Sequence, residues 1–278
     1  MIKVGILGGG QLGWMTVLEG QKLGFEFLVL EDKKDAPAGR VAPLYPTEKL
    51  DEFYAKADLI TWEFEHLPDA LLEKVADKLA SPPEALFIKK SRVREKLFLR
   101  KLGLPLPRFE IASAKELPEA VESVGLPAVV KAEHLGYDGK GQYRVKTLSE
   151  LKRILANHPP NARFVVEELV DFLAETSCVA VIPAEGEPLC YPMPYNYHLE
   201  GILYYNFVPF TERPEALNYA LTVARALNFV GVLTVEFFLT KEGKLLVNEF
   251  APRVHNTGHW TLDGAYTSQF ENHLRAIT

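Results

Sequence analysis

Two glutamates in the last quarter of the sequence could bind a metal ion together. Glu236 lies in the run VLTVEFFLT and Glu249 in KLLVNEFAP, and both runs are typical of strands. A two-residue turn at Glu242-Gly243 would place the two carboxylates directly opposite each other, with their Cβ atoms about 5 Å apart. Mg²⁺, or Mn²⁺, held by these carboxylates and by substrate phosphates would offset the repulsion. The alternatives are a shared proton, or a register one residue different that separates the side chains.

A polar stretch follows the second of these runs. Residues 248–260 read NEFAPRVHNTGHW, with an arginine, two histidines and two asparagines where a core strand ends. His255 and His259 are four residues apart, but Pro252 and Thr257-Gly258 indicate a loop, and no third ligand accompanies them. A zinc site is therefore not expected. The arginine, histidine and asparagine side chains of this stretch could instead bind an anion.

Lys131 and the loop after it could bind phosphates. Lys131 stands inside the apolar run PAVVKA, where an unpaired ammonium is costly, so we expect it to face a cleft and an anion; the alternative is a lysine facing solvent. The loop HLGYDGKGQ contains three glycines and Lys140 but lacks the spacing of a Walker A loop. It could close over a polyphosphate or be an exposed turn. Glu167, Glu168 and Glu175 follow, and taken singly each would face water.

A glycine-rich turn lies close to the start of the chain. The residues GGGQLG, Gly8 to Gly13, follow the strand-like run IKVGIL and precede a helical pattern, and Glu31 comes at about the distance of a ribose-binding acid. The N–H groups of such a turn suit any phosphate. Three possibilities stay open: a nicotinamide cofactor, another phosphorylated ligand, or a turn without a ligand.

Composition narrows the class of protein. The chain has 278 residues, 47% hydrophobic and 24% charged, which is typical of a globular protein with two or three lobes. A formal net charge of −6 disfavours nucleic-acid binding and polybasic membrane contacts. Without a signal peptide or an apolar run of about 18 residues, neither secretion nor membrane spanning is expected. Cys178 and Cys190 are expected to be reduced core residues of a cytoplasmic protein.

The elements that would position these residues form three successive regions. Residues 1–90 are predicted to be an α/β domain that opens as a βαβ unit, with a helix over 11–23 and strands over 2–7, 25–30 and 58–62. Residues 91–165 begin with a helix capped by Ser91 and contain a hairpin, 127–132 and 142–146. Residues 166–278 combine strands with an amphipathic helix over 214–227, and residues 264–278 are expected to be helical.

Taken together, the motifs resemble one family. In this order, GGGQLG, ITWEFEH, GYDGKGQ, VVEELV, NYHLEGIL and NEFAPRVHNTGHW closely resemble the 5-(carboxyamino)imidazole ribonucleotide synthases of the ATP-grasp superfamily. The resemblance implies a mixed α/β and α+β fold: a Rossmann-like N-terminal domain, then a two-lobed ATP-grasp fold. It also implies a ligase of purine biosynthesis that forms carboxyphosphate from ATP and bicarbonate. The carboxyl group would then pass to 5-aminoimidazole ribonucleotide.

The functional residues of the family carry over by motif. ATP would contact Arg92, Lys131, Glu175, His198, Asn248 and Glu249. The lid over its phosphates would consist of Tyr137, Asp138, Gly139, Lys140, Gly141 and Gln142. The segment that holds the adenine would be Glu167, Glu168, Leu169 and Val170. Glu236 and Glu249 would bind the metal ion. The reacting carboxyl group would meet Arg253, His255 and Asn256. In place of a nicotinamide cofactor, the imidazole ribonucleotide would contact Gly10, Gln11, Leu12, Glu63, Tyr137 and Arg253.

The resemblance carries further expectations. Members of the family continue past the helix that ends here at Thr278, so we expect a shortened chain that binds ATP but turns over the imidazole ribonucleotide poorly. A homodimer is implied, as is handover of the product to the mutase that follows in the pathway. The rival hypotheses are another ATP-grasp carboxylate–amine ligase and a nucleotide-binding protein without catalysis. The presence of Glu236 and Glu249 beside Arg253 argues against the second rival.

Overall fold

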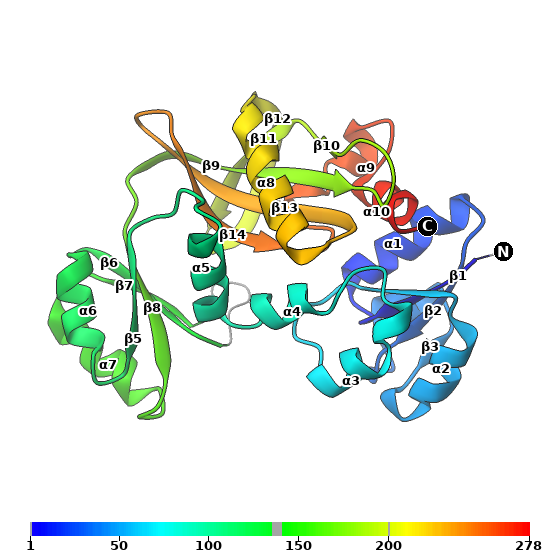
Figure 1. Cartoon of the computed structure of the whole chain (residues 1–278), viewed down its shortest axis with the longest axis horizontal. Helices are drawn as coiled ribbons and strands as arrows, with labels where there is room; N and C mark the ends of the chain where they lie inside the picture. The colour runs from blue at the N-terminus through cyan, green and yellow to red at the C-terminus, as the bar shows by residue number, and fades with distance from the viewer. Residues whose placement is uncertain (1, 135–140, 200) are drawn as a thin grey trace.

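The computed structural model describes residues 2–134, 141–199 and 201–278, and Figure 1 shows an N-terminal domain, a small lobe and a central lobe between them. The N-terminal domain is a parallel sheet in the order β3–β2–β1–β4, as the βαβ pattern predicts. Its strands are short apolar runs, as expected for parallel strands covered on both faces. The elements are β1 (Lys3–Leu7), α1 (Gln11–Lys22), β2 (Glu26–Leu30), β3 (Leu44–Tyr45), α2 (Leu50–Lys56), β4 (Leu59–Trp62), α3 (Asp69–Lys74) and α4 (Glu84–Lys89).

The small lobe is an antiparallel sheet in the order β5–β8–β6–β7 with two helices. Helix α5 (Arg92–Lys101) leads into it, and the Ser91 side chain accepts a hydrogen bond from the Arg94 N–H, which confirms the predicted N-cap. The predicted hairpin is present, with Lys131 opposite Gln142. The elements are β5 (Phe109–Ser113), α6 (Leu117–Val124), β6 (Ala128–Ala132), β7 (Gln142–Val145), α7 (Leu151–Ala156) and β8 (Arg163–Glu168).

The central lobe is a six-stranded antiparallel sheet in the order β12–β11–β9–β13–β14, with β10 paired to β9. Its elements are β9 (Phe172–Ile182), β10 (Leu189–Cys190), β11 (Met193–Leu199), β12 (Ile202–Thr211), α8 (Pro214–Leu227), β13 (Gly231–Thr240), β14 (Leu245–Ala251), α9 (Thr261–Gly264) and α10 (Gln269–Ile277). The prediction that residues 264–278 are helical throughout was wrong. Helix α10 begins after Ser268, whose hydroxyl accepts a hydrogen bond from the Glu271 N–H and so starts the helix there.

The hairpin of β13 and β14 pairs Glu236 with Glu249, as predicted, but its turn and its register near the turn differ from the prediction. Its turn contains three residues, 241–243, where two were expected, and the Thr240 N–H donates to the Lys244 carbonyl. Gly243 has φ 80°, a left-handed conformation that suits glycine. The strands therefore leave the turn one residue out of the expected register, and a bulge at Asn248 restores it at Glu249.

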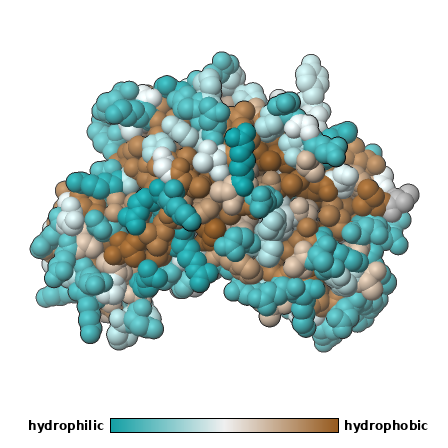
Figure 2. Space-filling model, in the orientation of Figure 1, coloured by the Kyte–Doolittle hydropathy of each residue, from teal (hydrophilic) through white to brown (hydrophobic). Residues whose placement is uncertain are grey.

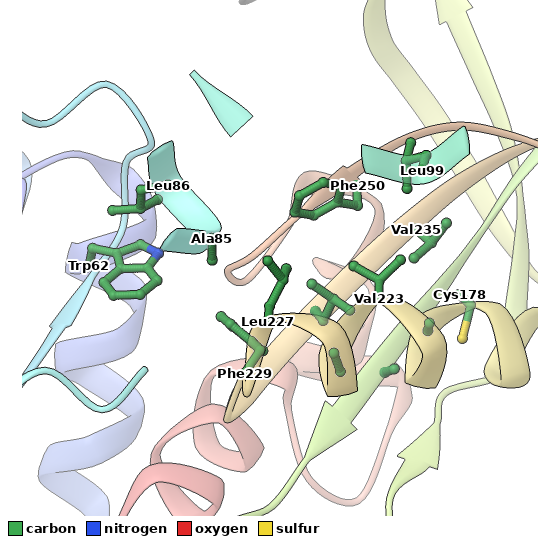
Figure 3. Packing of buried hydrophobic residues seen from close by; sticks show 14 of the residues in the cluster. Trp62, Ala85, Leu86, Leu99, Cys178, Val223, Leu227, Phe229, Val235 and Phe250 are labelled. Carbon is green, nitrogen blue, oxygen red and sulfur yellow. The ribbon is translucent and has the colours of Figure 1, made fainter. Parts of the chain in front are cut away.

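One hydrophobic cluster joins the N-terminal domain to the central lobe. Figure 3 shows Trp62 and Leu86 of the first packed toward Leu227 and Phe229 of the second. The Trp62 indole N–H also donates to the Pro252 carbonyl at 2.9 Å, because a buried tryptophan needs a partner for this group. This packing holds the polar stretch after β14 against the N-terminal domain.

The two cysteines differ from the sequence-based expectation. The sulfur atoms of Cys178 and Cys190 are joined in a disulfide, so the prediction of two reduced residues was wrong. Cys190 pairs with Ala180, which places Cys178 two residues along the same face of β9. Their Cα atoms are 6.1 Å apart, within bridging range.

The distribution of hydrophobic residues on the surface and the length of the helices distinguish proteins that span a membrane with helices. On the face shown in Figure 2, hydrophilic residues surround the margin and hydrophobic residues gather toward the middle. Among the residues that the structure describes, no helix is long and apolar enough to cross a membrane.

Candidate active site

Two cavities meet at the β13–β14 hairpin. The larger, about 560 Å³, lies between the small and central lobes and is lined by Arg92, Lys131, Gln142, Glu167, Glu168, Leu169, Val170, Glu175, His198, Glu236, Asn248 and Glu249. The smaller, about 160 Å³, is lined among others by Glu65, Lys89, Arg253, His255 and Asn256. Glu236 and Glu249 line both cavities, so the predicted metal pair stands where they meet.

Lys131 faces the larger cavity from β6. Its ammonium lies 2.7 Å from Oε2 of Glu167, whose other oxygen is 2.8 Å from Nζ of Lys96. Burial alone would raise the pKa of Glu167, but the two ammonium groups lower it to about 2. The Glu167 side chain is thus engaged in ion pairs, and any contact that it makes with adenine is left to its backbone.

Arg92 reaches the same cavity from the start of α5. Its guanidinium donates to the carbonyls of Ala132 and Gly141 at 3.2 and 3.3 Å. Of the predicted lid, Gly141 and Gln142 are therefore beside Arg92 and Lys131, respectively. Tyr137, Asp138, Gly139 and Lys140, also predicted for the lid, lie outside the described residues.

The carboxylates of Glu236 and Glu249 have different protonation behaviour. Burial and the neighbouring Glu249 raise the pKa of Glu236 to about 7. Burial opposes ionisation of Glu249 too, but Lys89, Lys131 and Arg92 outweigh it and hold its pKa well below the usual range. Within the described ranges no three acidic, histidine or cysteine side chains cluster as a complete metal site. The pair fits a hard cation that completes its coordination with phosphate oxygens.

Arg253 is fixed in the smaller cavity by an acid of the N-terminal domain. Its guanidinium lies 2.6 Å from Oε1 of Glu65, and both side chains are largely buried. Another guanidinium nitrogen donates to the Val254 carbonyl at 2.8 Å. The guanidinium is thus held at two points, while its buried Nε has no hydrogen-bond partner among the described residues.

His255 and Asn256 complete the small cavity. The imidazole Nδ1 of His255 lies 3.0 Å from the Thr257 hydroxyl, and Nε2 lies 3.5 Å from Glu236. Burial, and then the charge of Arg253, lower the pKa of His255 well below its ordinary value. The imidazole is therefore neutral near pH 7. Asn256 lines the cavity beside it.

His198 and Glu175 form a pair beside the cavities. The His198 Nδ1 lies 3.0 Å from Oε2 of Glu175, and His198 lines both cavities. Burial lowers the pKa of His198, but the nearby carboxylates, Glu175 first, give a net rise. Both residues line the larger cavity, and the family resemblance assigns both to the nucleotide.

The glycine-rich turn is occupied by the protein itself. The Gly10 and Gly13 N–H groups donate to Glu63 at 2.7 and 3.2 Å, and the Gly9 N–H donates to Glu31 at 3.2 Å. A Cβ at Gly10 would lie 2.8 Å from the Glu63 carboxylate, which explains the glycine. Phosphate binding by these N–H groups, left open by the sequence, is not favoured, because two carboxylates already take them.

The remaining residues predicted at this turn differ in exposure. Gln11 is exposed at the start of α1. Leu12 packs into a core cluster with Val254 and Phe270, so only its backbone could meet a substrate.

Sequence reasoning missed several charged residues near the cavities, among them Glu65, Lys89, Glu95 and Lys96. Glu65 could have been found, since it lies in the quoted run ITWEFEH among other polar residues. Lys89, Glu95 and Lys96 gave no signal, because their charges fit the polar face expected of a surface helix. In the structure all three are largely buried and ion-paired.

Comparison with known proteins shows the family of the chain. Residues 1–90 match the ribonucleotide synthetase preATP-grasp domain, and residues 97–270 match the ATP-grasp domain. The N5-carboxyaminoimidazole ribonucleotide synthase of Aquifex aeolicus is 57% identical over the whole chain, which covers 76% of that relative. The corresponding protein of Saccharolobus solfataricus is 44% identical over 99% of the chain and 76% of its own length.

Solved structures give the same result. The N5-carboxyaminoimidazole synthetase of Staphylococcus aureus complexed with ADP matches with a TM-score of 0.93 and 29% identity, covering 99% of this chain and 77% of that one. The Aspergillus clavatus enzyme in complex with ADP and 5-aminoimidazole ribonucleotide matches with a TM-score of 0.88 and 27% identity, over 99% and 76%.

Proposed function

The chain belongs to the N5-carboxyaminoimidazole ribonucleotide synthases, a family of ATP-grasp ligases, and on this premise we propose how its two cavities divide the reaction. It is a carbon–nitrogen ligase that carboxylates 5-aminoimidazole ribonucleotide with the use of ATP in purine biosynthesis. The main support for assigning ATP and the acceptor to different cavities is the position of Glu236 and Glu249, which line both cavities. ATP enters from one side and the acceptor from the other.

The larger cavity binds ATP in this proposal. Lys131 and Arg92 contact the phosphates, the backbone of residues 167–170 holds the adenine, and Glu175 accepts from the ribose hydroxyls. Glu236, Glu249 and Asn248 would hold Mg²⁺, or Mn²⁺, which would neutralise phosphate charge during transfer. Two opposed carboxylates at the junction of the cavities, one of them with a pKa of about 7, support this assignment because a cation removes their repulsion.

The smaller cavity binds bicarbonate and the acceptor amine. An oxygen of bicarbonate takes the γ-phosphoryl group of ATP, which gives carboxyphosphate and ADP. The amine nitrogen then attacks the carboxyl carbon, the bond from carbon to the phosphate oxygen breaks, and phosphate leaves. Arg253 and Asn256 donate to the carboxyl oxygens, and neutral His255 takes the proton that the amine loses. Carboxyphosphate is short-lived in water, so an enclosed site favours transfer.

Nucleotide hydrolysis tests this assignment. ATP hydrolysis that depends on bicarbonate and that 5-aminoimidazole ribonucleotide stimulates, even weakly, is the expected result. Stimulation only by glycinamide ribonucleotide would instead favour another carboxylate–amine ligase of the superfamily, and binding of ATP without turnover would favour a non-catalytic protein. We further propose a cytoplasmic homodimer that passes its product to the following mutase; sedimentation of the pure chain tests the dimer.

A further inference from the structure

Two lysines connect the same acid of the small lobe to the same asparagine of the central lobe. Nζ of Lys96 lies 2.8 Å from Oε1 of Glu167, and Nζ of Lys131 lies 2.7 Å from Oε2. Both ammonium groups also donate to Asn248 on β14. Lys96 meets its main-chain carbonyl at 2.8 Å, and Lys131 meets its side-chain oxygen at 3.3 Å. The four residues therefore form a closed ring of contacts between β8 and the metal-binding hairpin.

The two lysines differ in what they can reach. Lys131 lines the larger cavity, and its side chain is 12% exposed. Lys96 comes from α5, and its side chain is 4% exposed. Its ammonium pairs with the carbonyl of Asn248, the residue that the bulge leaves out of the strand pairing. Lys96 is therefore fixed between the lobes, whereas Lys131 can turn toward a ligand in the cavity.

The charge of Glu167 explains why two lysines are present. Its side chain is 3% exposed, and a buried carboxylate that loses its cationic partner is strongly destabilised. If Lys131 alone faced Glu167, a turn of Lys131 toward a phosphate would leave the carboxylate unpaired, so phosphate binding would compete with the ion pair. With Lys96 in place, Glu167 keeps a cation when Lys131 contacts the phosphates.

We propose that Lys96 is a positioning residue for ATP binding: it pairs with the charge of Glu167 and so leaves Lys131 available to the phosphates. Lys96 acts through Lys131 and does not itself contact the nucleotide. This inference rests on the contact between Lys131 and the ATP phosphates proposed above.

Replacing Lys96 with Met tests this role. Glu167 then keeps Lys131 as its cation, and loss of the hydrogen bond from Lys131 to a phosphate lowers the affinity for ATP roughly 10-fold or more. Adenosine has no phosphate, so its affinity is expected to stay at the wild-type value. Isothermal titration calorimetry of the full chain measures both, with a non-hydrolysable ATP analogue. Lys101→Met, an exposed lysine at the end of α5, is the matched control and should retain both affinities.

A double variant separates this role from a general loss of structure. Lys96→Met with Glu167→Gln removes both charges together and releases Lys131, so it is expected to recover most of the lost affinity for ATP. An unchanged affinity for ATP in Lys96→Met would overturn the proposal. An equal fall for ATP and adenosine would overturn it too, as would a double variant that binds ATP no better than Lys96→Met.

Lys131→Met is the reference for the proposed function. It is expected to bind ATP roughly 10-fold or more weakly than the wild type, for the same loss of a charged hydrogen bond. Wild-type affinity in this variant would overturn the phosphate contact itself, and the inference with it. Should Lys96→Met fail to fold, the double variant decides alone: tighter ATP binding than in Lys131→Met supports the role of Lys96, and equally weak binding overturns it.

Discussion

The guanidinium of Arg253 lies 2.6 Å from a carboxylate oxygen of Glu65, and this ion pair ties the loop after β14 to the N-terminal domain. The two residues are far apart in sequence and come together because Trp62, near Glu65, packs with the central lobe and bonds to Pro252, next to Arg253. The orientation of a reacting-site arginine therefore depends on the contact between two domains.

Replacing Glu65 with Gln is expected to impair acceptor chemistry and spare ATP binding. The amide keeps the shape but loses the charge that holds the Arg253 fork, and misplacement of a positioning group by about 1 Å costs roughly 10²-fold in rate. Turnover with 5-aminoimidazole ribonucleotide is the measurement, with ADP affinity measured alongside. Glu52→Gln, an exposed acid paired with Lys56, is the control. Unchanged turnover would show that Glu65 does not position Arg253.

Replacing Glu249 with Gln is expected to abolish most of the metal-dependent hydrolysis of ATP. The change removes one carboxylate of the opposed pair, and loss of a single group that stabilises transition-state charge costs about 10²- to 10³-fold. The rate is measured against Mg²⁺ concentration. Glu242→Gln, in the turn of the same hairpin and exposed to solvent, should behave as wild type. If Glu249→Gln retained the wild-type rate and Mg²⁺ dependence, the non-catalytic interpretation would gain support.

Replacing Glu63 with Ala is expected to weaken binding of the imidazole ribonucleotide. The carboxylate organises the turn through the Gly10 and Gly13 N–H groups, and hydrogen bonds to a charged group contribute about 1.5–3 kcal/mol each. The KM for this substrate should rise about 10-fold or more, while the KM for ATP stays constant. Glu26→Ala, an exposed acid on β2, is the control. An equal rise in both KM values would instead indicate general loss of structure.

Wild-type protein is expected to leave NADH fluorescence unchanged on mixing. The N–H groups that would receive a pyrophosphate are already bonded to Glu63 and Glu31. A saturable rise in fluorescence would reopen the dinucleotide alternative.

His273 is expected to make the free energy of unfolding depend on pH. Its ring bonds to the Thr61 hydroxyl and the Val232 N–H, and burial lowers its pKa from 6.5 to about 4. Between these values the unfolded chain binds more protons than the folded chain, so stability falls as the pH drops from about 6.5 to about 4. The loss is about 3 kcal/mol in total.

Urea unfolding at several pH values measures this effect. His273→Gln should show a smaller loss of stability between pH 6.5 and 4 than the wild type. His134→Gln, which changes an exposed histidine, should lose as much as the wild type. Parallel pH curves for the wild type and His273→Gln would contradict the assignment.

Sequence reasoning reached the Glu236–Glu249 pair for partly wrong reasons. It assumed a two-residue turn, whereas the turn has three residues and the bulge at Asn248 compensates for the extra one. Alternation of apolar and polar residues does not reveal a bulge, because a bulge depends on the partner strand as much as on its own sequence. The bulge also matters for the site, since the Asn248 side chain meets Lys131 at 3.3 Å.

The glycine-rich turn shows the opposite case. The local pattern of a strand, glycines and a helix was interpreted correctly, but the same pattern serves a phosphate or a carboxylate equally well. Glu63 comes from the end of β4, more than fifty residues later, and only the parallel pairing of β4 with β1 brings it to the turn. The division into residues 1–90, 91–165 and 166–278 remains a prediction.

The sequence by itself determined the local elements, the family and the kinds of group at the site. Periodicity, caps and motifs are properties of neighbouring residues, and they located Arg253, His255 and Asn256 as well as Lys131 and the acids of the hairpin. The tertiary structure alone decided which charges pair. Glu65 with Arg253, Glu63 with the glycine turn, and Lys89 with Glu249 all join segments distant in the chain. Such pairs form only when packing of the lobes buries the charges together, and no local pattern encodes that step.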